Sequence, residues 1–369
     1  MPHRWRRSAV VVMTGVVGAA VLAGCGSGGS TERPLVGVAM PTTASERWIA
    51  DGENVRSQLE ALAYDVDLRY AEDDVPTQIE QLTEMIDEGA DALVVGSIDG
   101  VALKDVLAEA AAADIPVIAY DRLIRESGDV DYYASFDNAR VGVQQATTLL
   151  QGLGIWNAAG EPTGSTGPFT IELFAGSPDD NNATVFYQGA MQVLQPYLDS
   201  GVLVVGSGQT DFTEIATERW DPKNATARMT ELMPRYTAGT RLDGVLSPYD
   251  GISIAVLDAA KQAGYGSADG LGPLPVVTGQ DAELASAQSV AAGEQYATIF
   301  KDTRQLAEVT VQMVHALLRG TEPEVNDTTS YDNGVTVVPA YLLAPQIVTE
   351  QNYQAVLVDG GTYTAQELN

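Results

Sequence analysis

The feature that most constrains this chain is the alternation of short valine- and isoleucine-rich runs with longer segments of helical period. In the longer segments, apolar residues recur every three or four positions, as at Val55, Leu59 and Leu62, which is the spacing of a helix packed on a sheet. This alternation is typical of βα units and parallel sheets, so we expect an α/β fold. The predicted strands are residues 35–40, 92–96, 115–119, 169–174, 202–205, 244–246, 275–278 and 296–300.

Two series of these units are separated by residues 156–167, a polar segment rich in glycine and proline. One doubly wound sheet rarely holds so many strands, so we expect two lobes. A further helix is predicted from Asp302 onward, and Gly320 is placed to end it.

Charge and residue usage exclude several classes of function. Fifty acidic and twenty basic side chains among 369 residues give a formal net charge of −30, which opposes attraction to nucleic acid or anionic lipid. His3 lies in the N-terminal segment, His315 lies in an apolar helical pattern, and Cys25 is the only cysteine. No histidine-based triad, zinc cluster or disulfide framework follows from these residues. We therefore expect no metal, no cofactor and no nucleic-acid partner.

The first 25 residues have the layout of an export signal, with arginines followed by the apolar stretch 9–22. This stretch is shorter than the roughly 18 to 20 residues that span a bilayer, which disfavours an uncleaved anchor. Small residues just before Cys25 resemble the bacterial lipobox. We therefore predict acylation of Cys25, a flexible tether over residues 26–34, and a lipid-anchored location on the extracytoplasmic face of the cell membrane.

Polar and aromatic side chains follow many of the predicted strands, at the edge where open parallel sheets bind ligands. Carboxylates accept hydrogen bonds, guanidinium groups donate them, and indole rings can cover the apolar C–H faces of a sugar. The set therefore suits a small polyhydroxylated ligand. Its members are Arg47, Trp48, Ser97, Asp99, Asp121, Arg122, Asp179, Asp180, Asn181, Asn182, Trp220, Tyr249, Asp250, Gln280, Asp281 and Lys301.

Several of these residues also have a purely structural interpretation. An aspartate after a strand is more often a helix N-cap than a ligand group, and Asp179 or Asp180 and Asp302 each precede a helical run. A single tryptophan such as Trp48 or Trp220 is more often part of a core.

A catalytic interpretation has weaker support than binding. Asp121 and Arg122 follow a buried strand as adjacent opposite charges, which favours a charged cleft edge, whereas Arg219 is predicted to form a surface or hinge ion pair. Carboxylates can form a glycosidase pair, but the separation that this requires is not visible in a sequence. The signatures of acyl transfer, phosphate-binding loops and dinucleotide binding are missing from the chain.

Six motifs carry a resemblance to a known family. They are RWIADG at 47–52, AYDRLIR at 119–125, GSPDDNNA at 176–183, LSPYDG at 246–251, GQDA at 279–282 and TIFKD at 298–302. Through them the chain resembles the periplasmic sugar-binding proteins of ABC importers, of the xylose-binding and multiple-monosaccharide-binding kind. The resemblance extends over nearly all of residues 35–361.

The resemblance implies a two-lobed type I periplasmic-binding-protein fold, in which each lobe is a mainly parallel sheet flanked by helices and three hinge crossovers join the lobes. Lobe 1 is expected to comprise 35–137 and 282–332, and lobe 2 to comprise 138–281 and 333–369. The implied function is a non-enzymatic, monomeric receptor that closes around an aldose and delivers it to an ABC permease. The alternatives are a sugar-sensing lipoprotein with a membrane signalling partner, a receptor for a non-sugar polyol or furanosyl ligand, and a secreted glycoside hydrolase.

The resemblance also implies which residues bind the ligand. Tyr249 stands where xylose-type members carry asparagine, Tyr187 where one presents arginine, and Arg47 where they carry lysine. The departure at Tyr187 favours the multiple-sugar subtype, with glucose, galactose, arabinose, xylose or a uronic acid as ligand. The departure at Tyr249 leaves open whether Tyr249 or Asp250 makes the contact of that segment, and Arg47 keeps the positive charge. The expected ligand groups are Arg47, Trp48, Asp121, Arg122, Asn182, Trp220, Tyr249, Asp250, Asp281 and Lys301.

Overall fold

The computed structural model describes residues 33–237 and 239–368. The predicted export signal, the predicted acylation of Cys25 and residues 26–32 of the predicted tether lie outside these ranges. Within them, no helix is long and apolar enough to cross a membrane.

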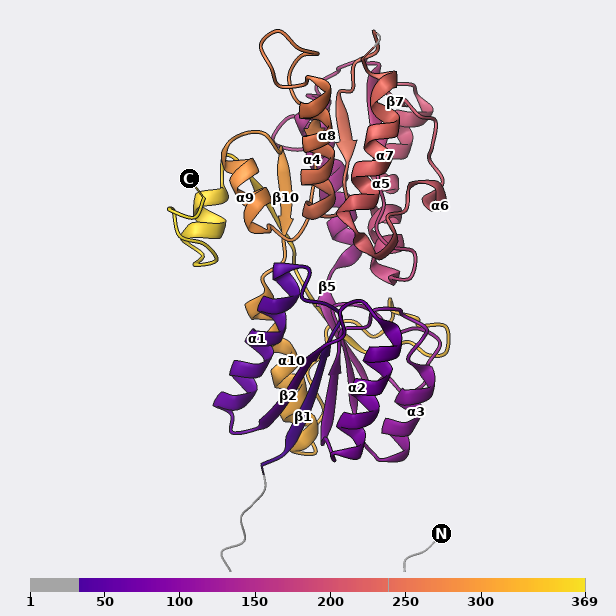
Figure 1. The fold of residues 1–369 in the computed structure, drawn as a ribbon, viewed down its shortest axis with the longest axis vertical. Coiled ribbons are helices and arrows are strands. Elements are labelled where there is room, and N and C mark those ends of the chain that lie inside the picture. The colour runs from indigo at the N-terminus through magenta and orange to yellow at the C-terminus, as the bar shows by residue number, and fades with distance from the viewer. Residues whose placement is uncertain (1–32, 238, 369) are drawn as a thin grey trace, which may run out of the picture. The chain divides into compact units, whose positions relative to one another are not determined.

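The first sheet has six strands in the order β11-β5-β4-β3-β1-β2, and all of its pairings are parallel. Helices α1 and α10 pack on one face and α2 and α3 on the other (Figure 1). The helices are α1 (Glu46–Ala61), α2 (Val75–Asp87), α3 (Lys104–Ala112) and α10 (Thr303–Leu318). The strands are β1 (Leu35–Met40), β2 (Asp65–Tyr70), β3 (Ala92–Val95), β4 (Val117–Tyr120), β5 (Tyr132–Phe136) and β11 (Ala340–Leu343).

The second sheet has four parallel strands in the order β7-β6-β8-β9. Strands β10 and β12 form an antiparallel pair, and the Ile299 N–H bonds to the Gly279 carbonyl at 3.2 Å, which places β10 beside the chain that follows β9. The strands are β6 (Phe169–Leu173), β7 (Leu203–Val205), β8 (Gly244–Leu246), β9 (Val276–Val277), β10 (Ala297–Phe300) and β12 (Gln346–Thr349). The helices are α4 (Asn138–Gly152), α5 (Asn181–Asp199), α6 (Phe212–Ile215), α7 (Pro222–Leu232), α8 (Asp250–Ala263) and α9 (Leu284–Ala291), with short turns at Glu218–Trp220, Met233–Arg235 and Gln354–Val358.

Parallel sheets flanked by helices confirm the α/β prediction. Local sequence pattern does not predict β2, β5, β11 and β12, because their runs are short or carry polar residues. Two predicted helix signals are confirmed in detail: Asp180 and Asp302 cap α5 and α10 by accepting hydrogen bonds from backbone N–H groups. Gly320 follows the end of α10 with φ of 70°, a left-handed conformation that glycine adopts without strain.

The chain passes between the two sheets three times within the described residues, after β5, after β10 and after β11. Two strands lie with the other sheet than the predicted boundaries imply. Strand β11, in the stretch 333–369 expected in lobe 2, pairs with β5 in the first sheet. Strand β10, in the stretch 282–332 expected in lobe 1, pairs with β12 beside the second sheet, whereas α10 of the same stretch packs on the first sheet. The sheet to which a strand belongs depends on pairing partners that are distant in sequence, and local periodicity does not indicate those partners. The division into two lobes itself remains a prediction.

Helices α4 and α5 cross at two glycines, and this crossing positions the start of α5. A Cβ atom on Gly142 would lie 2.0 Å from the Phe186 carbonyl oxygen, and one on Gly189 would lie 2.4 Å from the Ala139 carbonyl oxygen. The close approach lets Asn138 at the start of α4 donate from Nδ2 to Asn182 Oδ1 at 2.9 Å.

Candidate functional site

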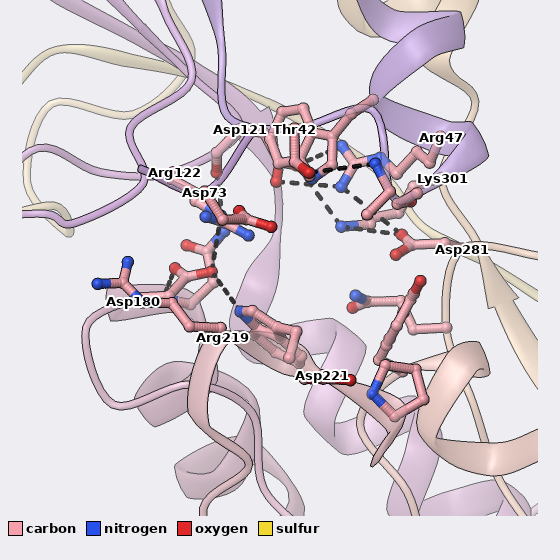
Figure 2. Close-up of a pocket in the computed structure, with 18 of the residues that line it drawn as sticks. Thr42, Arg47, Asp73, Asp121, Arg122, Asp180, Arg219, Asp221, Asp281 and Lys301 are labelled. Carbon is pink, nitrogen blue, oxygen red and sulfur yellow. Dashed lines mark hydrogen bonds and ion pairs between the residues drawn. The ribbon is translucent and has the colours of Figure 1, made fainter. Parts of the chain in front are cut away.

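A cavity of about 400 Å³ lies where the loops after several strands converge. That volume falls within the range of small-molecule sites. Nine of the ten expected ligand residues line it, and Asp250 is the exception. Figure 2 shows Arg47, Asp121, Asp281 and Lys301 close together on one side of the pocket, with Asp180 and Arg219 on another. The expected residues on its wall are Arg47, Trp48, Asp121, Arg122, Asn182, Trp220, Tyr249, Asp281 and Lys301.

Four charged side chains form the core of the site. Arg47 lies in the first turn of α1 and donates to both oxygens of Asp121, and Lys301 Nζ lies 3.1 Å from Asp281 Oδ1 and 3.5 Å from Asp121 Oδ1. Burial alone raises the pKa of the Asp121 carboxyl, but Arg47, and after it Lys301, outweigh burial and hold the pKa well below its usual range. The cluster therefore presents fixed positive and negative groups to the same space.

Asp121 is held in a backbone conformation that is unusual for a residue other than glycine. Its φ is 60°, in the left-handed region, which aspartate tolerates better than most residues. Its carbonyl oxygen accepts hydrogen bonds from Tyr133 Oη at 2.6 Å, Ser135 Oγ at 2.8 Å and Asn182 Nδ2 at 2.8 Å. These contacts over-determine the turn after β4 and aim the carboxylate at Arg47.

Asp51, one turn further along α1, supports Arg47 from behind the cavity. Its Oδ2 lies 3.1 Å from Arg47 Nε, and its Oδ1 accepts a hydrogen bond from Tyr120. The side chain is fully buried. Burial raises the pKa of Asp51 to about 7, against the opposite effect of Arg47. Asp51 thus orients the Arg47 guanidinium without lining the cavity.

Arg122 connects the loop after β4 to the start of α5. Its Nε lies 3.0 Å from Asp180 Oδ2, and its guanidinium lies over the Trp48 ring at 5.1 Å from the centroid. Trp220 Nε1 donates to Asp180 Oδ2 at 3.2 Å. Asp180 therefore caps α5, as its structural interpretation requires, and also orients Arg122 and Trp220 on the cavity wall.

Aromatic rings make up the apolar part of the wall. Trp220 meets Tyr249 edge-on, with 6.1 Å between ring centroids, and it packs against Phe186 at 6.4 Å. A Cβ atom on Gly176 would lie 2.0 Å from Trp220 Cη2, so only glycine leaves room for this indole. Rings of this kind provide flat apolar faces beside the charged cluster.

Asp250 does not line this cavity, which corrects its predicted contact with ligand. The side chain is fully buried. Its Oδ1 accepts from Gln295 Nε2 at 3.0 Å, and its Oδ2 accepts from Thr298 Oγ1 at 2.9 Å and from the Glu283 N–H at 3.0 Å. Asp250 thus joins α8 to α9 and β10, and its neighbour Tyr249 is the residue of this pair that faces the cavity.

Several residues of the wall are not predicted from the sequence. Arg219 forms the expected ion pair, with Nη1 3.1 Å from Asp179 Oδ2, yet it also lines the cavity. Gln280 follows its strand and belongs to the polar set, although it is not among the ten expected ligand groups. It is buried on the wall, and its Oε1 has no hydrogen-bond partner. Ser97 and Asp99 do not reach the cavity. The other missed residues are Thr42, Ala44, Ser45, Asp73, Phe186, Asp221, Pro222 and Lys223, and only tertiary proximity identifies them.

Comparisons with known proteins identify the family to which the chain belongs. Residues 36–322 match the family described as periplasmic binding protein domain. The chain is similar to the multiple sugar-binding periplasmic receptor ChvE of Rhizobium radiobacter, at 55% identity over 339 residues that cover 92% of this chain and 93% of that protein. It is 54% identical over 333 residues to the multiple sugar-binding periplasmic protein SbpA of Azospirillum brasilense, which covers 90% of each chain.

A solved structure agrees with these relatives. An ABC transporter solute binding protein from Clostridium phytofermentans, with bound β-D-glucose, matches with a TM-score of 0.85 and 45% identity over 91% of this chain and 100% of that one. The family expected from the six motifs is thereby confirmed. The chain belongs to the periplasmic binding protein domain family.

Proposed function

We propose that this chain is an extracytoplasmic receptor that binds one aldose monosaccharide in the described cavity and delivers it to an ABC permease. The observation that carries the proposal is the charged cluster of Arg47, Asp121, Asp281 and Lys301 beside the rings of Trp48 and Trp220. The proposal is supported by the relatives, because ChvE and SbpA are named as multiple sugar-binding proteins and the Clostridium phytofermentans protein holds β-D-glucose.

The chemistry of the wall suits a sugar. Each sugar hydroxyl donates one hydrogen bond and accepts others, so it can donate to Asp281 while accepting from Lys301 or Arg47. Hydrogen bonds to charged groups contribute about 1.5 to 3 kcal/mol each. Four or five of them therefore give about 6 to 15 kcal/mol before the ordering of the ligand is subtracted, compared with roughly 8 kcal/mol for micromolar binding. Micromolar or tighter binding is therefore expected.

Closure around the sugar follows from the distribution of these groups over both sheets. Asp121 and Arg122 follow β4 of the first sheet, whereas Asn182 lies in the first turn of α5, beside the second. A ligand that contacts both groups stabilises the closed arrangement more than the open one. The permease then distinguishes loaded from empty receptor by this arrangement.

The receptor is proposed to act without catalysis. A glycoside hydrolase needs one protonated carboxyl and one ionised carboxylate around the scissile bond. Asp121 instead lies between Arg47 and Lys301, which hold its pKa well below the usual range, so it is not suited to be the protonated acid. We expect no turnover of aryl glycosides.

Calorimetry on the chain from residue 26 onward tests the proposal. A panel of neutral aldoses, uronic acids, polyols and disaccharides is titrated at neutral pH. Saturable one-to-one binding of several monosaccharides, lost in Asp281→Ala, supports the receptor. A panel without any saturable response contradicts the monosaccharide assignment.

Membrane attachment through Cys25 is part of the proposal and has its own test. Wild-type protein and Cys25→Ser are expressed in a bacterial host fed a labelled fatty acid. We expect the wild-type chain to carry the label and to be found in the membrane fraction. We expect neither result for Cys25→Ser. Equal labelling of both proteins contradicts acylation at this cysteine.

A further inference from the structure

The carboxylate of Glu283 accepts hydrogen bonds from hydroxyl groups in two distant parts of the chain. Ser45 Oγ donates to Glu283 Oε1 at 2.7 Å, and Tyr249 Oη donates to the same oxygen at 2.9 Å. Ser45 precedes α1, which packs on the first sheet, and Tyr249 precedes α8 beside the second sheet. Glu283 therefore joins a loop of the first sheet to the wall formed by the second.

Glu283 itself does not line the sugar cavity, although both of its donors do. Tyr249 also belongs to the aromatic part of the wall. Its ring meets the Trp220 ring edge-on, with 6.1 Å between the ring centroids. Burial raises the pKa of the Tyr249 hydroxyl, so it remains a hydrogen-bond donor to the carboxylate. The hydrogen bonds through which Glu283 reaches the cavity wall are those to Tyr249 and Ser45.

The surroundings leave little freedom at either end of this link. A Cβ atom on Gly251 would lie 2.6 Å from Tyr249 Cε1, so the phenol ring is packed closely against the first turn of α8. The Glu283 N–H donates to buried Asp250 Oδ2 at 3.0 Å, which fixes the backbone that carries the carboxylate. Close packing of the Tyr249 ring and the fixed backbone of Glu283 therefore restrict the geometry of the hydrogen bond between them.

We propose that Glu283 is a positioning residue that holds Tyr249 on the cavity wall and ties Ser45 to it, and so slows release of the bound sugar. The inference rests on the proposed sugar-receptor function and adds to it a residue outside the cavity. Because the link joins elements of both sheets, its loss is expected to act on dissociation. Association depends on the open cavity and is expected to change little.

Stopped-flow tryptophan fluorescence on the chain from residue 26 onward measures both rates, with the monosaccharide that wild type binds most tightly in calorimetry. Tyr249→Phe and Ser45→Ala each remove one charge-assisted hydrogen bond and are expected to raise the dissociation rate about tenfold. Glu283→Ala removes both bonds and is expected to raise the rate at least as much. The double variant Tyr249→Phe/Glu283→Ala is expected to release sugar no faster than Glu283→Ala, since both changes break the same bond. Glu283→Gln is expected to restore slow release, because its amide oxygen accepts from both hydroxyls.

Matched controls separate this link from general destabilisation. Tyr64→Phe removes a phenol bonded to His315 Nδ1 at 2.7 Å beside the first sheet, and Ser57→Ala removes a hydroxyl on α1. Both are expected to keep the wild-type dissociation rate. Should Glu283→Ala fail to fold, Ser45→Ala and Tyr249→Phe carry the test.

Three results would overturn the inference while leaving the receptor function intact: unchanged release in Tyr249→Phe and Ser45→Ala, additive effects in the double variant, or release from Glu283→Gln as fast as from Glu283→Ala. A wild-type protein that binds no monosaccharide overturns the proposed function itself, and this inference with it.

Discussion

Arg47 and Asp121 are joined by two hydrogen bonds, from Nη1 to Oδ2 at 3.1 Å and from Nη2 to Oδ1 at 2.6 Å. Both side chains are buried, and Lys301 and Asp281 complete the cluster around them. A buried bidentate pair of this kind has a fixed geometry, because each partner would be an uncompensated charge without the other. The pair therefore gives the cavity a rigid charged wall before any ligand arrives.

Asp121→Asn is expected to break this wall while preserving the backbone. Asparagine tolerates the positive φ of this position, but it cannot balance Arg47 and Lys301. We expect the free energy of unfolding to fall by about 3 kcal/mol, the size of a broken buried pair, and sugar affinity to fall at least about tenfold. Urea unfolding and calorimetry measure the two effects.

Asp114→Asn provides the control for this variant. Asp114 also has a positive φ, of 57°, but it is exposed after α3 and does not line the cavity. Its substitution is expected to leave sugar affinity unchanged. Wild-type affinity in Asp121→Asn would show that the charge of this carboxylate is dispensable.

Asp51 is expected to make stability depend on pH. Burial raises its pKa to about 7, whereas an aspartate in an unfolded chain titrates near pH 4. Between about pH 4 and 7 the folded protein therefore binds more protons than the unfolded chain, and this contribution to stability falls as pH rises. The contribution is complete below the unfolded pKa and is lost as pH rises through the folded pKa.

Asp51→Asn removes this titration. The free energy of unfolding of the variant relative to wild type is expected to rise by up to about 1.4 kcal/mol per pH unit between pH 4 and 7, and to level above it. Urea unfolding at several pH values measures the difference, with Asp105→Asn at an exposed position of α3 as control. A difference independent of pH would contradict the assignment to Asp51.

Gly176→Ala is expected to disturb the aromatic wall. The new methyl group would lie 2.0 Å from Trp220 Cη2, so the indole must move. An aromatic contact contributes about 0.5 to 1.5 kcal/mol beyond its buried area, so its loss is expected to weaken sugar binding up to about tenfold. Calorimetry measures the affinity, and near-ultraviolet circular dichroism reports the ring.

Gly128→Ala is the matched control, because the nearest atom to its new methyl group is Val335 Cγ1 at 3.6 Å, an ordinary contact. If Gly176→Ala binds sugar as tightly as Gly128→Ala does, then Trp220 is not part of the ligand site.

Gly142→Ala tests the crossing of α4 and α5. Alanine favours a helix over glycine by about 1 kcal/mol, but the methyl group would overlap the Phe186 carbonyl oxygen, which cannot rotate away. Overpacking of this kind costs about 1 to 3 kcal/mol. We expect a lower melting temperature than that of wild type. A melting temperature higher than that of wild type would mean that α4 and α5 can move apart at no cost in stability.

Local sequence pattern predicted much of the fold. The apolar runs at β1, β3, β6 and β8 and the helical spacing of α1 were sufficient for an α/β fold, because burial on both faces of a parallel sheet requires such runs. The caps at Asp180 and Asp302 were also predictable, since capping depends on a few neighbouring residues. The residues after the strands gave about half of the cavity wall, because strand ends meet at one edge of a sheet.

The tertiary structure alone decided what long-range contacts control. The partners of β10, β11 and β12 lie far away in sequence, so the lobe boundaries could not be predicted from periodicity. Asp250 and Tyr249 are neighbours in the chain, yet Asp250 is turned into the contact between α8 and β10 while Tyr249 faces the cavity. Sequence thus determined which chemical groups gather after the strands. Packing decided which of them reach the ligand space, because that depends on side-chain direction and on partners that only folding brings together.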